Sequence, residues 1–258
     1  MMRKELTYLG TAIMFFTRIP IPFKLPYSTE IMNKSQKYFP FVGIIVGLFT
    51  ALVYAGAMTF FSVQISMIIA TIASVLLTGA FHEDGFTDSC DAFGGGYGKE
   101  KIMTIMKDSR IGAYGVIGII LLLLLKITTL TEIGTHSTPL VIFTLISGHA
   151  VSRFHAGMAI YTHEYVQDID KSKSKPLASK RLPWANVLIG FGTILIPFVI
   201  YQQWLLLMAI PISYLGKIYL TYYFKKHIGG YTGDGLGAIQ QVSEVIYYLT
   251  ILALCSYM

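Results

Sequence analysis

The chain has 258 residues, of which 54% are hydrophobic and only 13% are charged, and its mean hydropathy is +0.60. A soluble domain of this length usually carries about 25% charged residues, so the composition argues against an ordinary soluble fold. The two cysteines, Cys90 and Cys255, are too few and too far apart to indicate a disulfide framework or a zinc site.

The N-terminus begins with a short apolar stretch that Thr17, Arg18 and Pro20 interrupt. No cleavage site of the small-x-small type follows, so we do not interpret it as a signal peptide. Residues 5–19 are predicted to form an amphipathic or re-entrant segment at the cytoplasmic surface. An eighth, tilted span is the alternative interpretation.

Apolar runs of membrane length then recur along the chain. A helix needs roughly 20 apolar residues to cross the hydrocarbon layer, and seven runs are close to that length. The sequence therefore predicts an all-α, polytopic transmembrane bundle of about seven spans, with six to eight as the range, in a single integral-membrane domain over residues 1–258. The runs are 39–61, 63–81, 111–130, 138–160, 184–202, 203–223 and 236–257.

The basic residues are distributed asymmetrically between the two sets of loops. With the N-terminus in the cytoplasm, 17 of the 20 Lys and Arg residues fall in cytoplasmic segments and none in the opposite loops. This is the positive-inside pattern of a multi-pass membrane protein. The pI of about 9.1 therefore reflects topology, and we expect no nucleic-acid partner. The cytoplasmic segments are 1–38, 82–110, 161–183 and 224–235.

The most informative segment is the acidic run that follows the second apolar stretch, residues 79–98. Asp84, Asp88 and Asp91 have the spacing i, i+4, i+7, which places all three on one helix face. Three carboxylates on one face repel one another unless a cation joins them, and hard oxygen ligands suit Mg²⁺ or Mn²⁺. Glu83 is a further candidate ligand and His82 a candidate general base. The alternative is a solvated acidic first turn of a helix.

Two further polar segments fall on the cytoplasmic side. In the first, Asp108 lies among Lys107, Ser109 and Arg110, where it could complete a metal shell while the basic residues hold phosphate. The alternative is that these basic residues only fix the orientation of the neighbouring span in the membrane. In the second, residues 229–237 are rich in glycine and contain Thr232 and Asp234, which suit either an anion site or a helix cap.

Arg153 stands within an apolar helix, where a charge is costly without an anionic partner. It is either a phosphate ligand or the structural partner of an acidic residue. A metal ion held by carboxylates, with Lys and Arg nearby, is typical of sites that catalyse phosphoryl transfer.

These residues together resemble the cobalamin synthase (adenosylcobinamide-GDP ribazoletransferase) family, and the resemblance covers essentially the whole chain. The distinctive runs are HEDGFTDSCDA at 82–92 and MKDSRIGAYG at 106–115. Supporting runs are FTRIP at 16–20, FPFVG at 39–43 and GGYTGD at 229–234. Phe93 departs from the family pattern, without bearing on the acidic residues.

The resemblance implies a Mg²⁺-dependent membrane transferase that joins adenosylcobinamide-GDP to α-ribazole, or to its 5′-phosphate, with release of GMP. We expect His82, Asp84 and Asp88 to be catalytic. The expected metal ligands are Asp84, Asp88, Asp91, Asp108 and Glu83. The expected substrate-binding residues are Lys107, Ser109, Arg110, Arg153, Thr232, Asp234 and Arg18. The active site is expected to face the cytoplasm, and self-association is left open.

Two rival functions remain at this stage. The acidic run is loosely similar to the motif of CDP-alcohol phosphotransferases, although the Ala-Arg pair of that motif is missing here. A membrane transporter would place ionisable residues near the middle of the membrane. Nearly all acidic residues of this chain lie on or can reach the cytoplasmic side instead, with Glu132 the exception and Glu244 uncertain.

Overall fold

The computed structural model of the protein describes residues 2–22, 24–26, 28–166 and 183–257. The described chain is helical, and its one β-bridge joins Tyr165 to Tyr231. The helices are α1 (Met2–Phe16), α2 (Thr29–Ser35), α3 (Phe39–Ala57), α4 (Val63–Thr78), α5 (Phe81–Gly95), α6 (Lys99–Met106), α7 (Ala113–His136), α8 (Thr138–Thr162), α9 (Trp184–Tyr201), α10 (Ala209–Ile228) and α11 (Gly233–Cys255), with 3₁₀ turns η1 (Gln36–Tyr38) and η2 (Trp204–Met208).

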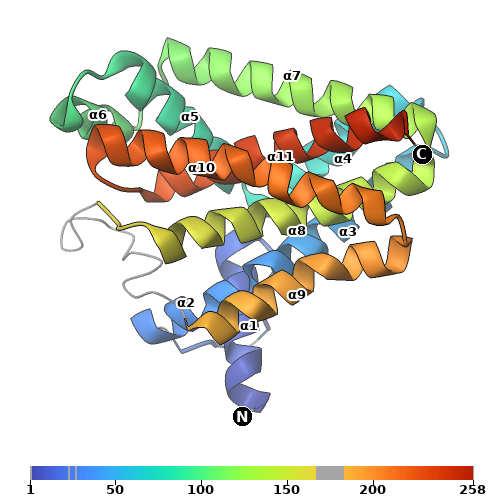
Figure 1. Ribbon diagram of the computed structural model, residues 1–258, viewed down its shortest axis with the longest axis horizontal. Coiled ribbons are helices and arrows are strands. Elements are labelled where there is room, and N and C mark those ends of the chain that lie inside the picture. Colours follow the sequence, from blue (N-terminus) through green and yellow to red (C-terminus); the bar gives the residue numbers. More distant parts are fainter. Residues whose placement is uncertain (1, 23, 27, 167–182, 258) are drawn as a thin grey trace.

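The long helices α3, α7, α8, α9, α10 and α11 run along the long axis of the molecule, and α1 crosses them (Figure 1). Helices α3 and α8 approach closely because Gly43 and Gly47 face the α8 backbone. A Cβ added at Gly47 would lie 2.6 Å from the Cα of Ile146. Small residues at such a contact are typical of helices that pack within a membrane.

Five helical segments are long and apolar enough to cross a membrane, and α4 with α5 forms a sixth candidate that is bent by 90°. The five are Thr29–Ala57, Ala113–His136, Trp184–Tyr201, Trp204–Ile228 and Gly233–Cys255. Apolar side chains on these helices face outward, as a lipid-facing surface requires. The all-α polytopic fold is therefore confirmed.

The number of spans and the orientation of the N-terminus stay predictions. Each of the seven predicted runs corresponds to a helix, but the 63–81 run is interrupted by the bend before α5. The 138–160 run corresponds to α8, which carries Arg153 and is not among the five apolar segments. The predicted N-terminal segment forms α1, a helix of 15 residues.

The acidic helix α5, the short helix α6 and the turn before α11 lie at one end of the bundle, and the C-terminus lies at the other (Figure 1). Most of the predicted cytoplasmic loop 161–183 lies outside the described residues. Its first part is described and pairs with the turn before α11, since Val166 donates to the Tyr231 carbonyl and Tyr231 donates to that of Glu164.

Candidate active site

A sharp turn between α4 and α5 positions the acidic segment. Gly79 and Ala80 both have left-handed backbone conformations, with φ of 68° and 58°, and together they turn the chain by 90°. Alanine rarely adopts this conformation. The backbone N–H of Arg18 donates to the Leu77 carbonyl at 2.7 Å, and its guanidinium lies against Gly79. Arg18 is therefore placed directly beside the start of α5.

Helix α5 packs against the first turns of α11 through two glycines. A Cβ added at Gly85 would lie 2.9 Å from the Asp234 carbonyl oxygen, and one at Gly237 would lie 3.0 Å from the His82 carbonyl oxygen. Only glycine permits this approach of the two backbones. Residues about 150 positions apart in the sequence are thereby brought into contact.

The contact gathers three carboxylates, Asp84 and Asp88 from α5 and Asp234 from α11, which we call the carboxylate cluster. Asp84 and Asp234 both act electrostatically on Asp88, and Asp84 acts on Asp234. Asp84 is exposed, whereas Asp88 and Asp234 are half-buried. Carboxylates that act on one another in this way repel when ionised, unless a cation lies between them.

The cluster does not by itself enclose a metal ion. Within the described ranges, no three His, Cys, Asp or Glu side chains converge as a complete metal site. Mg²⁺ commonly takes only one or two carboxylates and completes its shell with water and substrate phosphates. The hard, negatively charged donors of the cluster fit that type of site.

Asp91 has a different environment from the other aspartates of α5. Its two oxygens accept the backbone N–H groups of Gly112 at 2.6 Å and Gly115 at 2.8 Å, and the side chain is 9% exposed. A Cβ added at either glycine would clash with the Asp91 carboxylate. Asp91 thus holds the N-terminus of α7 against α5. Its predicted role as a metal ligand stays a prediction.

Glu83 points away from the carboxylate cluster and into the bundle. Its Oε1 accepts a hydrogen bond from Gln241 at 2.9 Å, and Gln241 in turn accepts one from Lys126 at 2.8 Å. The Oε2 atom is buried and has no hydrogen-bond partner in the described chain. The Glu83 side chain therefore lies on a different face of α5 from Asp84 and Asp88.

The segment before α7 lies at the surface. Arg110 forms a bidentate pair with Asp108, with Nε–Oδ1 and Nη2–Oδ2 distances of 3.0 and 2.7 Å. These hydrogen bonds lower the pKa of Asp108 to about 2. Both residues border an open hollow of about 510 Å³ that also reaches Asp91. Lys107 and Ser109 are exposed on either side of Asp108.

Thr232 is the N-cap of α11. Its hydroxyl accepts the Gly235 N–H at 3.0 Å, and the side chain is fully buried. Asp234 is therefore the second residue of the helix, where a carboxylate interacts favourably with the helix dipole. Thr232 therefore caps the helix, and the predicted roles of Thr232 and Asp234 in substrate binding stay predictions.

A buried ionic network in the middle of the bundle was missed by the sequence reasoning. Glu244, which is 0% exposed, pairs with Lys126 at 2.9 Å and His149 at 3.2 Å. It also accepts hydrogen bonds from Ser152, Gln240 and Tyr248. The signal was the presence of Lys126 within an apolar run, because a basic residue there requires an acidic partner.

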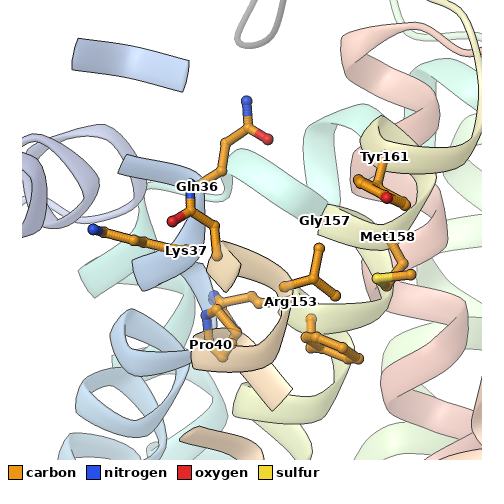
Figure 2. Close-up of a pocket in the computed structure, with 11 residues that line it drawn as sticks. Gln36, Lys37, Pro40, Arg153, Gly157, Met158 and Tyr161 are labelled. Carbon is orange, nitrogen blue, oxygen red and sulfur yellow. The ribbon is translucent and has the colours of Figure 1, made fainter. Parts of the chain in front are cut away.

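Arg153 is 2% exposed and lies beside this network. Its Nη1 donates to the His149 carbonyl at 3.0 Å, and among the described residues it forms no ion pair with a carboxylate within 4.0 Å. Two cavities flank it. Figure 2 shows the first cavity, where Arg153 lies across from Gln36 and Pro40.

The second cavity, which we call the aromatic cavity, lies between Arg153 and His82. Its remaining walls include Phe15, Phe16 and Phe81. The His82 ring is 4% exposed and stacks on Phe16 with a centroid distance of 5.5 Å and an interplanar angle of 9°. His82 thus stands between the aromatic cavity and the carboxylate cluster.

Comparison with known proteins shows that the chain belongs to one family. Residues 8–252 match the family model described as cobalamin-5-phosphate synthase. The adenosylcobinamide-GDP ribazoletransferase of Shewanella amazonensis is 41% identical over 255 residues, covering 98% of each chain. The protein of the same name from Shewanella piezotolerans is 42% identical over 251 residues, covering 97% of this chain and 96% of its own. No solved structure matches the chain significantly.

Proposed function

Since the chain belongs to the cobalamin-5-phosphate synthase family, we propose that this membrane transferase joins adenosylcobinamide-GDP to α-ribazole or α-ribazole 5′-phosphate. In the reaction, a ribazole hydroxyl oxygen forms a bond to the phosphorus that carries the cobinamide. The bond from that phosphorus to the bridging oxygen of the pyrophosphate breaks, and GMP leaves. The product is adenosylcobalamin or its 5′-phosphate.

The observation that supports this proposal is the meeting of Asp84, Asp88 and Asp234 across the contact between α5 and α11. When Mg²⁺ is bound, it neutralises phosphate oxygens and supplies the positive charge that phosphoryl transfer requires. One or two carboxylates of the cluster formed by Asp84, Asp88 and Asp234 would hold it, and water and substrate phosphates would be its remaining ligands.

The remaining site residues bind and orient the substrates. His82 follows the sharp turn into α5 and lies two positions before Asp84, so it is our candidate to accept the proton of the attacking hydroxyl. Arg110 borders the open hollow beside α5 and is proposed to bind the pyrophosphate. Lys107 and Ser109, exposed on either side of Asp108, are proposed to assist it. Arg18, beside Gly79, is proposed to bind an outer phosphate or ribose oxygen.

We further propose that the site faces the cytoplasm of a prokaryotic cell. The positive-inside distribution supports this orientation, because the carboxylate cluster lies at the end of the bundle that carries α6 and the turn before α11 (Figure 1). Both soluble substrates would then reach the site without crossing the membrane.

The rival interpretation as a transporter gains two structural features, the bent pair α4–α5 and the buried Glu244. However, the carboxylate of Glu244 is already engaged by Lys126 and His149 and by three further hydrogen bonds. A fully paired carboxylate leaves no site for a transported cation, so the network is best explained as structural.

The direct test uses the purified full-length protein in liposomes, supplied with adenosylcobinamide-GDP, α-ribazole 5′-phosphate and Mg²⁺. We expect one GMP released for each cobalamin phosphate formed. The matched control is Glu132→Gln, which changes an exposed acid whose one ion pair among the described residues is with His136 and should leave turnover unchanged. GMP release without a cobalamin product would identify a pyrophosphate hydrolase and contradict the proposal.

A further inference from the structure

The open hollow beside α5 has the size of a site for a small ligand. The end of α5, helix α6 and the start of α7 surround it at one end of the bundle (Figure 1). Its volume of about 510 Å³ lies within the range of roughly 300–1,000 Å³ that is typical of sites for small organic ligands. A ligand with the size of a nucleotide therefore fits there.

Tyr114 provides an aromatic surface in the wall of the hollow. It belongs to the first turn of α7, and its ring packs against Gly94 of α5, where an added Cβ would lie 2.5 Å from the ring Cγ. Tyr114 is nevertheless 58% exposed. An aromatic ring that is supported by the protein and still accessible is a surface on which a planar base can stack.

Asp108 and Arg110 bring opposite charges to the same wall. Their side chains are 36% and 87% exposed. Besides the two contacts given above, the Arg110 backbone N–H donates to Asp108 Oδ1 at 3.1 Å. An exposed ion pair of this kind adds little to stability, so its partners exchange readily. Once a phosphate engages the Arg110 guanidinium, the Asp108 carboxylate is free to accept hydrogen bonds from another part of the same ligand.

The hollow also adjoins the carboxylate cluster. Asp91 lies in its wall and acts electrostatically on Asp88, which precedes it by about one helical turn. A ligand in the hollow therefore lies next to the proposed reaction centre. Because the hollow is open, a product released into it can leave without passing through the bundle.

These features describe a ligand with a planar base, hydrogen-bond donors on the edge of that base, and phosphate. We propose that the open hollow binds the guanosine monophosphate half of adenosylcobinamide-GDP, the part that leaves as GMP, an inference that rests on the proposed function. The guanine base stacks on Tyr114, a phosphate contacts Arg110, and the N1–H and 2-amino groups donate to Asp108. In this assignment Asp108 contacts the base and is not a metal ligand.

The other parts of the two substrates do not match the hollow. The base of α-ribazole carries no N–H group, so it gains nothing from a carboxylate acceptor. The cobinamide ring system with its adenosyl group is far larger than a nucleobase. Guanine is thus the part of the substrates whose size and donor groups both fit the wall formed by Tyr114 and Asp108.

The first experiment measures equilibrium binding of GMP, AMP and xanthosine monophosphate (XMP) to the full-length protein in detergent. The wild type should bind GMP about tenfold or more tightly than AMP, whose base has neither an N1–H nor a 2-amino group. Asp108→Asn should lose this preference and bind XMP more tightly than GMP, because asparagine can accept from N1–H and donate to the 2-oxo group of xanthine. Equal binding of GMP and AMP by the wild type, or an unchanged preference in Asp108→Asn, would overturn the assignment.

Tyr114→Ala tests the stacking surface in the same assay. It should weaken GMP binding by about tenfold, whereas Tyr114→Phe should retain wild-type binding. Tyr97→Ala is the matched control, since Tyr97 is 92% exposed and lies outside the hollow. GMP binding by Tyr114→Ala that equals the wild type would also overturn the assignment. If Tyr114→Ala does not fold, the comparison of XMP with GMP in Asp108→Asn decides the proposal.

Turnover separates this inference from the proposed function. Wild-type turnover of adenosylcobinamide-GDP without a preference for GMP over AMP would overturn the inference and leave the proposed function standing. Selective binding of GMP by a wild-type protein that produces no cobalamin would instead refute the proposed function, while the hollow would remain a site for a guanine nucleotide.

Discussion

The carboxylate of Asp91 lies 2.6 Å from the backbone nitrogen of Gly112, at the point where the chain enters α7. A second hydrogen bond from Gly115 occupies the other oxygen. Asp91 therefore caps the N-terminus of α7, although it belongs to a different helix, α5. Its neighbours on the same helix face, Asp84 and Asp88, have no such backbone partners among the described hydrogen bonds.

This difference predicts opposite effects on stability. Asp91→Ala should lower the free energy of unfolding by about 1–3 kcal/mol, because the buried N–H of Gly115 and the part-buried N–H of Gly112 lose their acceptor. Asp88→Ala should leave stability unchanged or raise it, because it relieves repulsion from Asp84 and Asp234. Denaturant unfolding in detergent measures both variants. If Asp88→Ala were as destabilising as Asp91→Ala, the distinction between a structural role for Asp91 and a place in the carboxylate cluster for Asp88 would be wrong.

The buried network predicts a second stability effect. Glu244→Gln leaves Lys126 buried without its carboxylate, which should cost about 3–5 kcal/mol. The double variant Glu244→Gln, Lys126→Met should regain part of that loss, because no buried charge remains unpaired. The same unfolding assay applies. Equal stability of the wild type and Glu244→Gln would contradict the pairing of Lys126 and Glu244.

Arg110→Lys tests the proposed contact with the pyrophosphate. A lysine cannot reproduce the two parallel hydrogen bonds of a guanidinium, so we expect kcat/KM for adenosylcobinamide-GDP to fall by about tenfold or more. Lys101→Ala on α6 is the control, since it is exposed and lies outside the hollow that Arg110 borders. An equally small effect of Arg110→Lys and Lys101→Ala would show that the basic residues of the 107–112 segment only orient the protein in the membrane. Lys173→Ala, in the predicted cytoplasmic segment 161–183, is a second control, and position 173 lies outside the described residues.

The predicted orientation can be measured by cysteine labelling in a background in which Cys90 and Cys255 are replaced by serine. Tyr97 is 92% exposed near the acidic helix, and Phe60 is 83% exposed after α3. An impermeant thiol reagent added to intact cells should modify Phe60→Cys and spare Tyr97→Cys, with the reverse in inverted vesicles. External labelling at position 97 would reverse the topology.

Much of the fold was predictable from the sequence because apolar runs of membrane length determine where helices form. The run 184–202 corresponds to Trp184–Tyr201, and the run 236–257 overlaps Gly233–Cys255 over residues 236–255. The bend before α5 was not predicted, because it depends on Ala80 adopting a backbone conformation that its residue type disfavours.

The candidate site was predictable only in part. The spacing of Asp84 and Asp88 indicates a shared helix face, and α5 provides it. The approach of Asp234 depends on the packing of Gly85 and Gly237 between two helices, and no local pattern encodes a contact over that sequence distance. The same holds for Glu244, whose partners come from α7 and α8.

The central claim is that Asp84, Asp88 and Asp234 act together as the carboxylates of the phosphoryl-transfer site. The most direct measurement is the rate of GMP release by Asp234→Asn in liposomes as Mg²⁺ is titrated, beside Asp88→Asn and the Glu132→Gln control. Loss of a carboxylate that supports transition-state charge typically costs about 100-fold or more in rate. We predict that both aspartate variants fall by at least that factor, require more Mg²⁺ and remain folded. Wild-type rates at low Mg²⁺ for Asp234→Asn would show that α11 contributes no ligand and would contradict the account.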